Sequence, residues 1–327
     1  MKVQVQYHGR CFDGVVSAAL FTAFYRSCIT PRSNFVYTAR FHCAGSPYNS
    51  KSFTAPVNAV VDFRYSDHPN LHWWFDHHLS SFGSPEERRT FETRELAQHV
   101  WDTDAPSCAG LIARVAEESF GFDTSRYQEL IEWADMIDAA NFPNVKAAID
   151  VNSPAIQVMT WICKNREFPA TNEVIRQMAR GISLEELAEH PKIVETKNFL
   201  KKNQKRLFEW MYMNSKDHGG VVAFDLSKAQ GVTYDKFVPY YLFPKSHFCV
   251  LLSRSSHKLK ITVGVNPWNK KENAPSMAKI CESYGGGGHA DVGAFNLPLH
   301  SINEALQTLD DIVHTLKISC RKENIES

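Results

Sequence analysis

Histidines and aspartates recur in the first part of the chain, at expected strand ends and on expected helices. They are His8 and Asp13 in YHGRCFDG, Asp62 in AVVDF, Asp76, His77 and His78 in WWFDHH, and Asp135 and Asp138 in WADMIDAANF. Mixed imidazole and carboxylate ligands suit Mn²⁺ or a similar divalent ion. Clustered carboxylates can also hold two ions about 3.5–4 Å apart, which together clamp a phosphoryl group. These residue types therefore predict a divalent-metal site that acts on phosphate.

Each of these residues has an ordinary explanation when it is taken alone. A lone His8 near a strand end is most often a surface or hydrogen-bonded histidine, and Asp62 could cap a helix. Asp135 and Asp138, three residues apart, could form a solvated helix face. The run HWWFDHH at 72–78 is different, because packing gives no simple reason for an apolar strand to end in Asp-His-His. Taken together, the residues favour a functional site.

The elements that must position these residues alternate between strand and helix. Strands are expected at 3–7, 35–41, 57–63 and 72–76, and helices at 14–27, 107–121 and 125–140. Such alternation predicts a parallel sheet covered by helices. In parallel sheets, functional groups gather at the carboxyl ends of the strands. Several of the candidate residues come directly after expected strands.

The expected secondary structure of the later part of the chain changes from helices to strands after a long helical stretch. Residues 153–215 read as helices, and strands are then expected at 219–226, 247–255 and 258–266. A chain of 327 residues is long enough for two domains. We therefore expect an α/β fold with an N-terminal parallel-sheet domain flanked by helices, a helical linker and a smaller α/β C-terminal domain. The expected bounds are 1–185, 186–215 and 216–327.

The second domain contains the unusual run YGGGGHADVGAF at 284–295. Its glycines Gly285, Gly286, Gly287 and Gly288, followed by His289, could form a nest of backbone N–H groups that binds an anion. The alternative is a flexible linker, but the run lies between an expected helix and an apolar strand, which favours phosphate binding. Arg254 comes after another expected strand and could present a planar fork to a phosphate or carboxylate.

Composition excludes some classes of function. Lysine and arginine total 36 and aspartate and glutamate total 36, so the net charge is zero. A dedicated duplex-DNA binder would need a basic excess. No apolar stretch is long enough to span a membrane. The start, MKVQVQYHGRCFDG, lacks the apolar core of a secretion signal. These features favour a cytoplasmic protein whose eight cysteines are free thiols.

In this order, the motifs resemble those of the DHH phosphoesterase superfamily with its C-terminal DHH-associated domain, in particular its nanoRNase and nucleotide phosphoesterase branch. Asp76-His77-His78 is the naming motif, Asp13-Gly14 resembles the first motif, and GGGGHADVGAF resembles the signature of the associated domain. The resemblance covers most of the chain. It implies a Mn²⁺-dependent phosphoesterase with its active site in the cleft between two domains.

The resemblance also implies residue roles. The metal ligands would be His8, Asp13, Asp62, His77 and Asp135, with Asp62 bridging two ions and Asp138 as the competing alignment for Asp135. Asp76 would orient His77, and His78 would face the substrate phosphate or leaving group. Arg254 and the glycine loop with His289 would bind the far side of the substrate, and His289 could also help to protonate the leaving oxygen.

The sequence departs from the family pattern at one place. The first motif usually has two aspartates after the histidine, whereas HGRCFDG offers only Asp13 and places Cys11 where the other carboxylate is expected. A thiolate could bind metal, but a hard ion such as Mn²⁺ prefers oxygen, which favours a neutral, packed Cys11. The choice between one bound ion and two therefore stays open.

The implied function is hydrolysis of phosphate esters by metal-activated water. The neutral charge fits a small nucleotide or short oligonucleotide better than a long polyanion. Mg²⁺ and Co²⁺ are alternatives to Mn²⁺, and a homodimer is compatible with the resemblance. The altered first motif leaves a second reading, a catalytically impaired nucleotide-binding sensor. A third is an exopolyphosphatase-like phosphoanhydride hydrolase.

Overall fold

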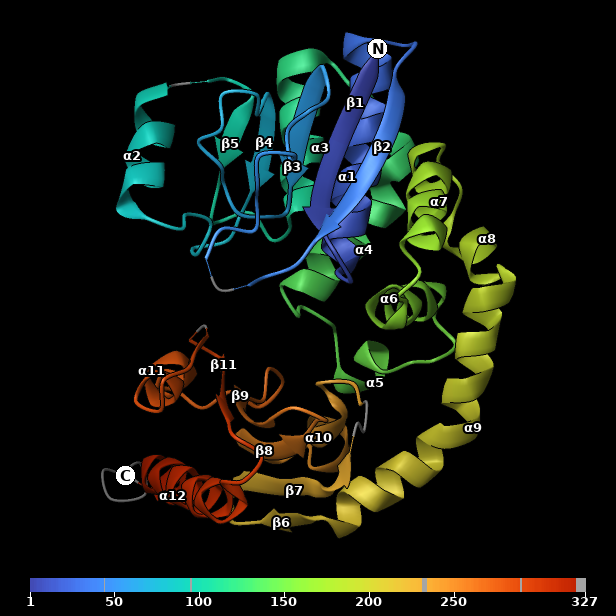
Figure 1. Ribbon diagram of the computed structural model, residues 1–327. Coiled ribbons are helices and arrows are strands. Elements are labelled where there is room, and N and C mark those ends of the chain that lie inside the picture. Colours follow the sequence, from blue (N-terminus) through green and yellow to red (C-terminus); the bar gives the residue numbers. More distant parts are fainter. Residues whose placement is uncertain (44, 95, 231–233, 289, 322–327) are drawn as a thin grey trace. The chain divides into compact units, whose positions relative to one another are not determined.

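The chain forms two compact units in the computed structural model (Figure 1). The structure describes residues 1–43, 45–94, 96–230, 234–288 and 290–321. Unit 1 comprises Met1–Phe142 and Val151–Asn198, and unit 2 comprises Pro143–Asp150 and Phe199–Ser327. Unit 1 contains a parallel sheet with helices, and unit 2 contains a mixed sheet with helices. The predicted α/β fold class is therefore confirmed.

The sheet of unit 1 places the ends of its strands at one edge. Its strands are β1 (Lys2–His8), β2 (Asn34–Arg40), β3 (Val57–Val61), β4 (Trp73–Asp76) and β5 (His99–Trp101). The order is β2-β1-β3-β4-β5, and every pairing is parallel. After β1 the chain forms β2 on one side of β1, and then crosses to form β3, β4 and β5 on the other side. The strand order therefore reverses between β1 and β3. In open parallel sheets, ligands bind beyond the carboxyl ends of the strands at such a reversal.

The two central strands are buried on both faces. All residues of β3 and β4 are buried, as expected for strands that are covered on both sides. Successive side chains of a strand point to opposite faces. Trp73 accordingly packs against Phe21 and Phe24 of the helical layer, whereas Trp74 packs with Tyr65 on the other face. The paired tryptophans thus anchor β4 from both sides and fix the position of the residues after it.

Helices cover one face of this sheet. They include α1 (Phe12–Phe24), which is buried along its whole length, α3 (Cys108–Phe120), α4 (Gln128–Asp138), α6 (Pro154–Lys164) and α7 (Phe168–Ala179). The apolar side chains of these helices and of the strands share one core. Shorter segments are the π-helical turn Tyr25–Ile29, the 3₁₀ turn Ser125–Tyr127, α2 (Pro85–Arg94) and α8 (Leu184–Ala188). Because α1 and α3 both begin at the carboxyl edge of the sheet, their first turns lie near the strand ends.

The helix α9 (Pro191–Met213) accounts for most of the predicted linker 186–215. The division between the two units falls inside this helix, after Asn198. The assignment of catalysis to 1–185 and of substrate binding to 216–327 stays a prediction.

Unit 2 contains a six-stranded sheet. Its strands are β6 (Ser215–Asp217), β7 (Val221–Gln230), β8 (Phe248–Arg254), β9 (Leu259–Val265), β10 (Gly287–Gly288) and β11 (Val292–Leu297), in the order β10-β11-β9-β8-β7-β6. Only the β7–β8 pairing is parallel among these described strands. The helix α12 (Ile302–Arg321) packs an apolar stripe on the sheet. The short helices are α5 (Val145–Ala148), α10 (Val238–Leu242) and α11 (Met277–Glu282).

Among the described residues, every helix is too short or too polar to cross a lipid bilayer.

Candidate active site

Asp62 lies between two histidines at the carboxyl edge of the parallel sheet. Its Oδ2 is 3.4 Å from His8 Nδ1, and its Oδ1 is 3.7 Å from His77 Nε2. His8 ends β1, Asp62 comes after β3 and His77 comes after β4, so three adjacent strands deliver the three side chains. Asp62 is only 1% exposed and has a left-handed backbone with φ of 54°. Such a conformation costs energy in a non-glycine residue and is common at functional sites.

Asp13 joins this group from the first turn of α1. Its Oδ2 accepts the backbone N–H of Cys108 at 2.8 Å, and its Oδ1 accepts that of Ala109 at 2.9 Å. These groups belong to the N-terminus of α3, whose dipole favours a carboxylate. Asp13 Oδ2 also lies 3.6 Å from His77 Nε2. The carboxylate is therefore held rigidly beside the histidine.

Gly14 explains why the motif reads Asp-Gly. A Cβ at this position would lie 2.3 Å from the His8 carbonyl oxygen and 3.1 Å from Asp62 Oδ2. Only glycine lets α1 begin this close to the strand ends.

Asp138 is the carboxylate of α4 that reaches the cluster. Its Oδ2 lies 3.3 Å from His77 Nε2. Asp135, which the resemblance placed among the ligands, instead accepts a hydrogen bond from Ser107 Oγ at 2.6 Å. A Cβ added at Gly110 would lie 2.6 Å from Asp135 Oδ1, so Asp135 also fits tightly against α3. The competing alignment is the one that brings a carboxylate to His77, which favours Asp138 over Asp135 as the ligand.

The His77 ring is oriented by a backbone carbonyl. Its Nδ1 lies 3.0 Å from the carbonyl oxygen of Ala105 and can only donate there. That contact fixes the tautomer with the proton on Nδ1 and leaves the Nε2 lone pair facing Asp13, Asp62 and Asp138. A histidine held in this way is prepared to bind a metal through Nε2.

Asp76 orients His78 rather than the His77 ring, which corrects the role expected from the resemblance. Its Oδ1 is 2.7 Å from His78 Nδ1, and its Oδ2 accepts a hydrogen bond from Ser81 Oγ at 2.6 Å. Toward His77 it only accepts the backbone N–H, at 2.9 Å. Burial lowers the pKa of His78, but the hydrogen bond and the charge of Asp76 outweigh burial and raise the pKa above its ordinary value. His78 is thereby favoured in its protonated form.

Several buried polar atoms of this cluster have no hydrogen-bond partner within the described part of the chain. They are His8 Nδ1, both carboxylate oxygens of Asp62, and His77 Nε2. Buried polar atoms are normally paired, so convergent exceptions indicate a missing ligand. Three groups in the cluster have ligand atoms within 4.8 Å of one another: His8, Cys11 and Asp62; Asp62, His77 and His78; and Asp13, His77 and Asp138.

The electrostatics of the cluster indicate that the ligand is a cation. Burial raises the pKa of Asp13 to about 6, and the charge of Asp138 adds to the rise. Burial also raises the pKa of Asp62 well above its usual range, with further contributions from Asp13 and Asp138. For His8, burial lowers the pKa to about 4, so this imidazole is neutral at pH 7. Crowded buried carboxylates next to the neutral imidazole of His8 are costly without a positive charge, and a divalent ion supplies it. The residues present therefore fit a metal centre.

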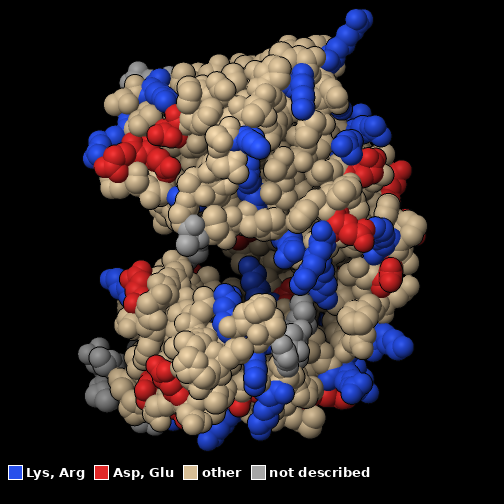
Figure 2. Space-filling view, viewed as in Figure 1, with Lys and Arg blue, Asp and Glu red and all other residues tan. Residues whose placement is uncertain are grey.

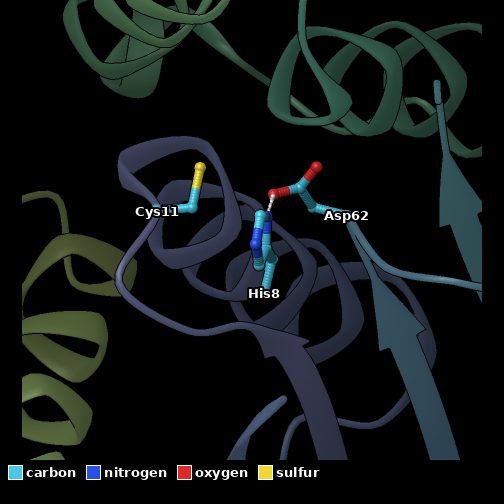
Figure 3. A group of neighbouring side chains, drawn as sticks. All are labelled: His8, Cys11 and Asp62. Carbon is cyan, nitrogen blue, oxygen red and sulfur yellow. Dashed lines mark ion pairs between the residues drawn. The ribbon is translucent and has the colours of Figure 1, made fainter. Parts of the chain in front are cut away.

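Cys11 lies at the edge of this cluster, in the turn that leads from β1 into α1 (Figure 3). Burial raises the pKa of its thiol, and the carboxylates of Asp62, Asp138 and Asp13 raise it further.

The glycine loop of unit 2 is built into the fold. Gly285 has a φ of 76° and ends α11, with its N–H bonded to the Glu282 carbonyl and the Gly286 N–H bonded to that of Cys281. A Cβ at Gly286 would lie 2.3 Å from the carbonyl oxygen of Ala294 in the neighbouring segment β11. The backbone conformation therefore favours glycine at position 285, and close packing requires it at position 286.

The other residues of this loop differ from one another. Gly288 is as constrained as Gly286, since a Cβ there would lie 2.2 Å from the Val292 carbonyl oxygen, whereas a Cβ at Gly287 meets nothing within 4 Å. Arg254 ends β8 and is exposed. His289 lies outside the described residues. Gly287 and Arg254 are thus two positions at which a ligand could be contacted without disturbing the core.

Comparisons with known proteins connect this geometry to one fold. No protein-family model matches the chain, and no curated protein matches it. Solved structures do match. A pGpG-specific phosphodiesterase from Vibrio cholerae is 18% identical, with a TM-score of 0.67, covering 97% of this chain and 100% of that one. The DHH domain of a member of a ribosomal protein family is 13% identical, with a TM-score of 0.61, covering 96% and 87%. Manganese-bound exonuclease RecJ is 10% identical, with a TM-score of 0.52, covering 95% and 89%.

The chain has the DHH fold. The resemblance seen in the sequence is confirmed at the level of the fold.

His42 also lies beside the cluster, although the sequence motifs do not include it. Its ring centroid lies 4.9 Å from that of His8, in an edge-to-face contact. His42 is exposed and comes shortly after β2, the strand that pairs with β1. The signal was therefore present, since His42 comes directly after the strand expected at 35–41. Ser107 was also missed; it caps α3 by accepting the Gly110 N–H at 2.9 Å and holds Asp135.

Proposed function

We propose that this chain is a metal-dependent phosphoesterase that hydrolyses phosphoric ester bonds in small nucleotides or short oligonucleotides. The observation that carries the proposal is the position of Asp62, which is buried, has no hydrogen bond to either carboxylate oxygen within the described residues, and is flanked by His8 and His77. The DHH fold supports it, since structures with this fold include a pGpG-specific phosphodiesterase and a manganese-bound exonuclease. The proposed catalytic centre lies within unit 1.

The metal ligands proposed are His8, Asp13, Asp62, His77 and Asp138. Asp62 is proposed to be shared between two positions, because its two oxygens face different histidines. Mn²⁺ is the ion we propose first, since three of these five ligands are carboxylates, which suit manganese. When bound, a divalent ion polarises a phosphoryl oxygen and acidifies water.

His78 is proposed to move a proton. Asp76 holds its Nδ1 and favours the imidazolium, which suits a group that protonates the leaving oxygen. The side chain of His78 is 26% exposed, so the ring is accessible from solvent. Asp76 is then a positioning residue, since it acts through His78.

The binding of the substrate is proposed to involve unit 2. Arg254 is exposed and suits a phosphate or carboxylate because guanidinium donates two parallel hydrogen bonds. The backbone at Gly287, together with His289, is proposed to contact a second phosphate. Basic and acidic side chains are both present on the face shown in Figure 2, and the net charge of zero fits a short substrate.

The test is a substrate panel on chelated protein to which single ions are returned. Mononucleotides, linear and cyclic dinucleotides, short oligonucleotides and polyphosphate are incubated with Mn²⁺, Mg²⁺ or Co²⁺, and products are separated by chromatography. We expect release of mononucleotide with Mn²⁺ and none in excess chelator. Asp62→Asn is the matched control, since it keeps the shape of the side chain but removes its charge. Undiminished hydrolysis in chelator, or by Asp62→Asn, would refute the proposal.

A further inference from the structure

Cys11 occupies a position that helix formation does not explain. It is the N-cap residue of α1, with extended backbone at φ −113° and ψ 136°, but its side chain makes no capping hydrogen bond. N-cap positions favour serine, threonine, aspartate and asparagine, whose oxygen accepts a backbone N–H. The thiol therefore does not serve the helix start.

The Cys11 sulfur instead shares a pocket with two unsatisfied groups. Its Sγ, a ring nitrogen of His8 and a carboxylate oxygen of Asp62 all lie within 4.8 Å of one another (Figure 3). His8 Nδ1 and the oxygens of Asp62 are buried and have no hydrogen-bond partner among the described residues. Three elements, the end of β1, the start of α1 and the segment after β3, thus direct one potential ligand each to a common point.

A neighbouring cysteine shows what a structural thiol looks like in this fold. Cys108 is fully buried, and its sulfur accepts the Asp62 N–H at 3.2 Å and donates to the Phe75 carbonyl at 3.3 Å. Cys108 is absent from every group of potential metal ligands found among the described residues, whereas Cys11 is present. The Cys108 thiol is thus hydrogen-bonded to the backbone, whereas the Cys11 thiol faces potential metal ligands, although both lie close to Asp62.

A second pocket in the same cluster contains only oxygen and nitrogen. It comprises Asp13, His77 and Asp138. Asp62 connects the two pockets, because its Oδ2 is 3.4 Å from His8 and its Oδ1 is 3.7 Å from His77. A divalent ion in each pocket would therefore meet a different ligand chemistry.

We propose that the two metal positions are chemically distinct, and that Cys11, with His8 and Asp62, forms a sulfur-containing pocket that selects a thiophilic ion such as Zn²⁺, Co²⁺ or Fe²⁺. The all-oxygen-and-nitrogen pocket of Asp13, His77 and Asp138 retains the preference for Mn²⁺. This inference rests on the metal centre in the proposed function. Its physical basis is ligand softness, since thiolates select zinc and related ions whereas carboxylates suit manganese and magnesium. The sequence alone favours a neutral Cys11 that does not bind metal, whereas its position beside His8 and Asp62 favours a thiol that releases its proton to solvent when an ion binds.

The experiment uses Co²⁺ as a spectroscopic probe of the full-length, metal-free protein. A thiolate bound to Co²⁺ gives a charge-transfer band in the near ultraviolet, which oxygen and nitrogen ligands do not give. We expect this band in the wild type and in Cys43→Ser, whose exposed thiol lies outside the cluster. We expect no band in Cys11→Ser, with the Co²⁺ affinity of this position falling by more than about 100-fold, because even the loss of an outer partner costs 10–100-fold.

A second variant and a competition complete the test. Cys11→Asp should still bind a second ion, without the charge-transfer band, and this position should now prefer Mn²⁺ to Zn²⁺. In the wild type, Zn²⁺ should displace the Co²⁺ that gives the band, and Mn²⁺ should not. Alkylation of Cys11, followed by mass spectrometry of the wild type, should slow when Zn²⁺ is added, which keeps the test independent of variant folding. Bound Co²⁺ without the band in the wild type would overturn this inference and leave the proposed function standing. Failure to bind any of these ions would overturn both.

Discussion

The imidazole Nδ1 of His78 donates to Asp76 Oδ1 across 2.7 Å, and this contact separates the roles of two adjacent histidines. His77 Nδ1 donates a hydrogen bond to the Ala105 carbonyl, and its Nε2 faces the carboxylate cluster. His78 is tied to a buried carboxylate, which Ser81 Oγ also holds at 2.6 Å. The rings of the two adjacent histidines are therefore held by different partners, His77 by a backbone carbonyl and His78 by a carboxylate.

Asp76→Asn should reduce turnover without removing metal. The variant removes the charge that raises the pKa of His78, so less of the imidazole is protonated at neutral pH. We expect kcat to fall by roughly 10–100-fold at pH 7.5, which is less than the roughly 10²–10⁴-fold that general-acid catalysis contributes, because His78 itself is kept. Since activity that needs the protonated ring is lost as pH rises through its pKa, the alkaline limb of the kcat profile should move to lower pH. Metal content by mass spectrometry should equal that of the wild type. An unmoved alkaline limb would remove His78 from this role.

Asp138→Asn and Asp135→Asn form a matched pair that identifies the ligand on α4. Asp138 Oδ2 faces His77 at 3.3 Å, so its amide variant should lose at least one equivalent of Mn²⁺. Asp135 instead accepts the Ser107 hydroxyl at 2.6 Å, and its variant should keep the metal. A weakened hydrogen bond of this kind costs about 0.5–1.5 kcal/mol of stability. Metal counting and denaturant unfolding measure the two effects. The reverse outcome, metal loss in Asp135→Asn alone, would restore Asp135 as the ligand.

The sequence predicted the residues at the strand ends well, but it predicted less about α4 and about the backbone segment that contacts His77. Asp62 and His77 could be predicted because buried strands are nearly continuous apolar runs, and the first residues after such strands must lie at the sheet edge. The choice between Asp135 and Asp138 depends on how α4 packs against α3, which local periodicity does not define. The partner of the His77 ring is the backbone of Ala105, which carries no side-chain signal and lies 28 residues away.

Two glycines of the loop 285–288 should respond in opposite ways to a side chain. Gly286→Ala places a Cβ 2.3 Å from the Ala294 carbonyl oxygen and 2.5 Å from Phe295 Cβ, so it should destabilise the fold by about 1–3 kcal/mol. Gly287→Ala meets nothing within 4 Å and should change stability by less than about 0.5 kcal/mol. Thermal and urea unfolding of the two variants compares them directly. Equal destabilisation would show that Gly287 is also held by packing.

Arg254→Ala and Gly287→Val should raise KM for a nucleotide substrate and leave the Mn²⁺ content unchanged. Arg254 is exposed, and a side chain at position 287 would enter open space, so neither change disturbs the core. A minimal substrate such as p-nitrophenyl phosphate lacks the distal groups that these residues are proposed to bind, and its hydrolysis should change much less. Lys258→Ala, in the turn between β8 and β9, is the control for a general loss of positive charge. Equal losses on both substrates would place Arg254 at the reacting phosphorus, and loss of metal would refute a role confined to substrate binding.

His99 should make the stability of the fold sensitive to acid. It lies in β5, is 7% exposed and packs edge-to-face against Tyr65 with ring centroids 5.7 Å apart. Its pKa is lowered from 6.5 to about 4, mainly by burial and to a smaller extent by the charges of Arg94 and His72. Between these values the unfolded chain binds a proton that the folded chain does not, so this residue's contribution to stability is complete above pH 6.5 and is lost as pH falls toward 4. The full contribution is about 3 kcal/mol at most.

The buried groups of the metal centre titrate in the same range, so the test compares two proteins. The free energy of unfolding in urea is measured between pH 4.5 and 7.5 for the wild type and for His99→Gln, which cannot titrate. His8, with its pKa also lowered to about 4, adds a slope of the same sign, whereas Asp13, with its pKa raised to about 6, adds one of opposite sign. Both groups are common to the two proteins and cancel in the difference. We expect the wild type to lose more stability than His99→Gln as the pH falls below 6.5. Parallel curves would show that His99 is protonated in the folded protein without penalty.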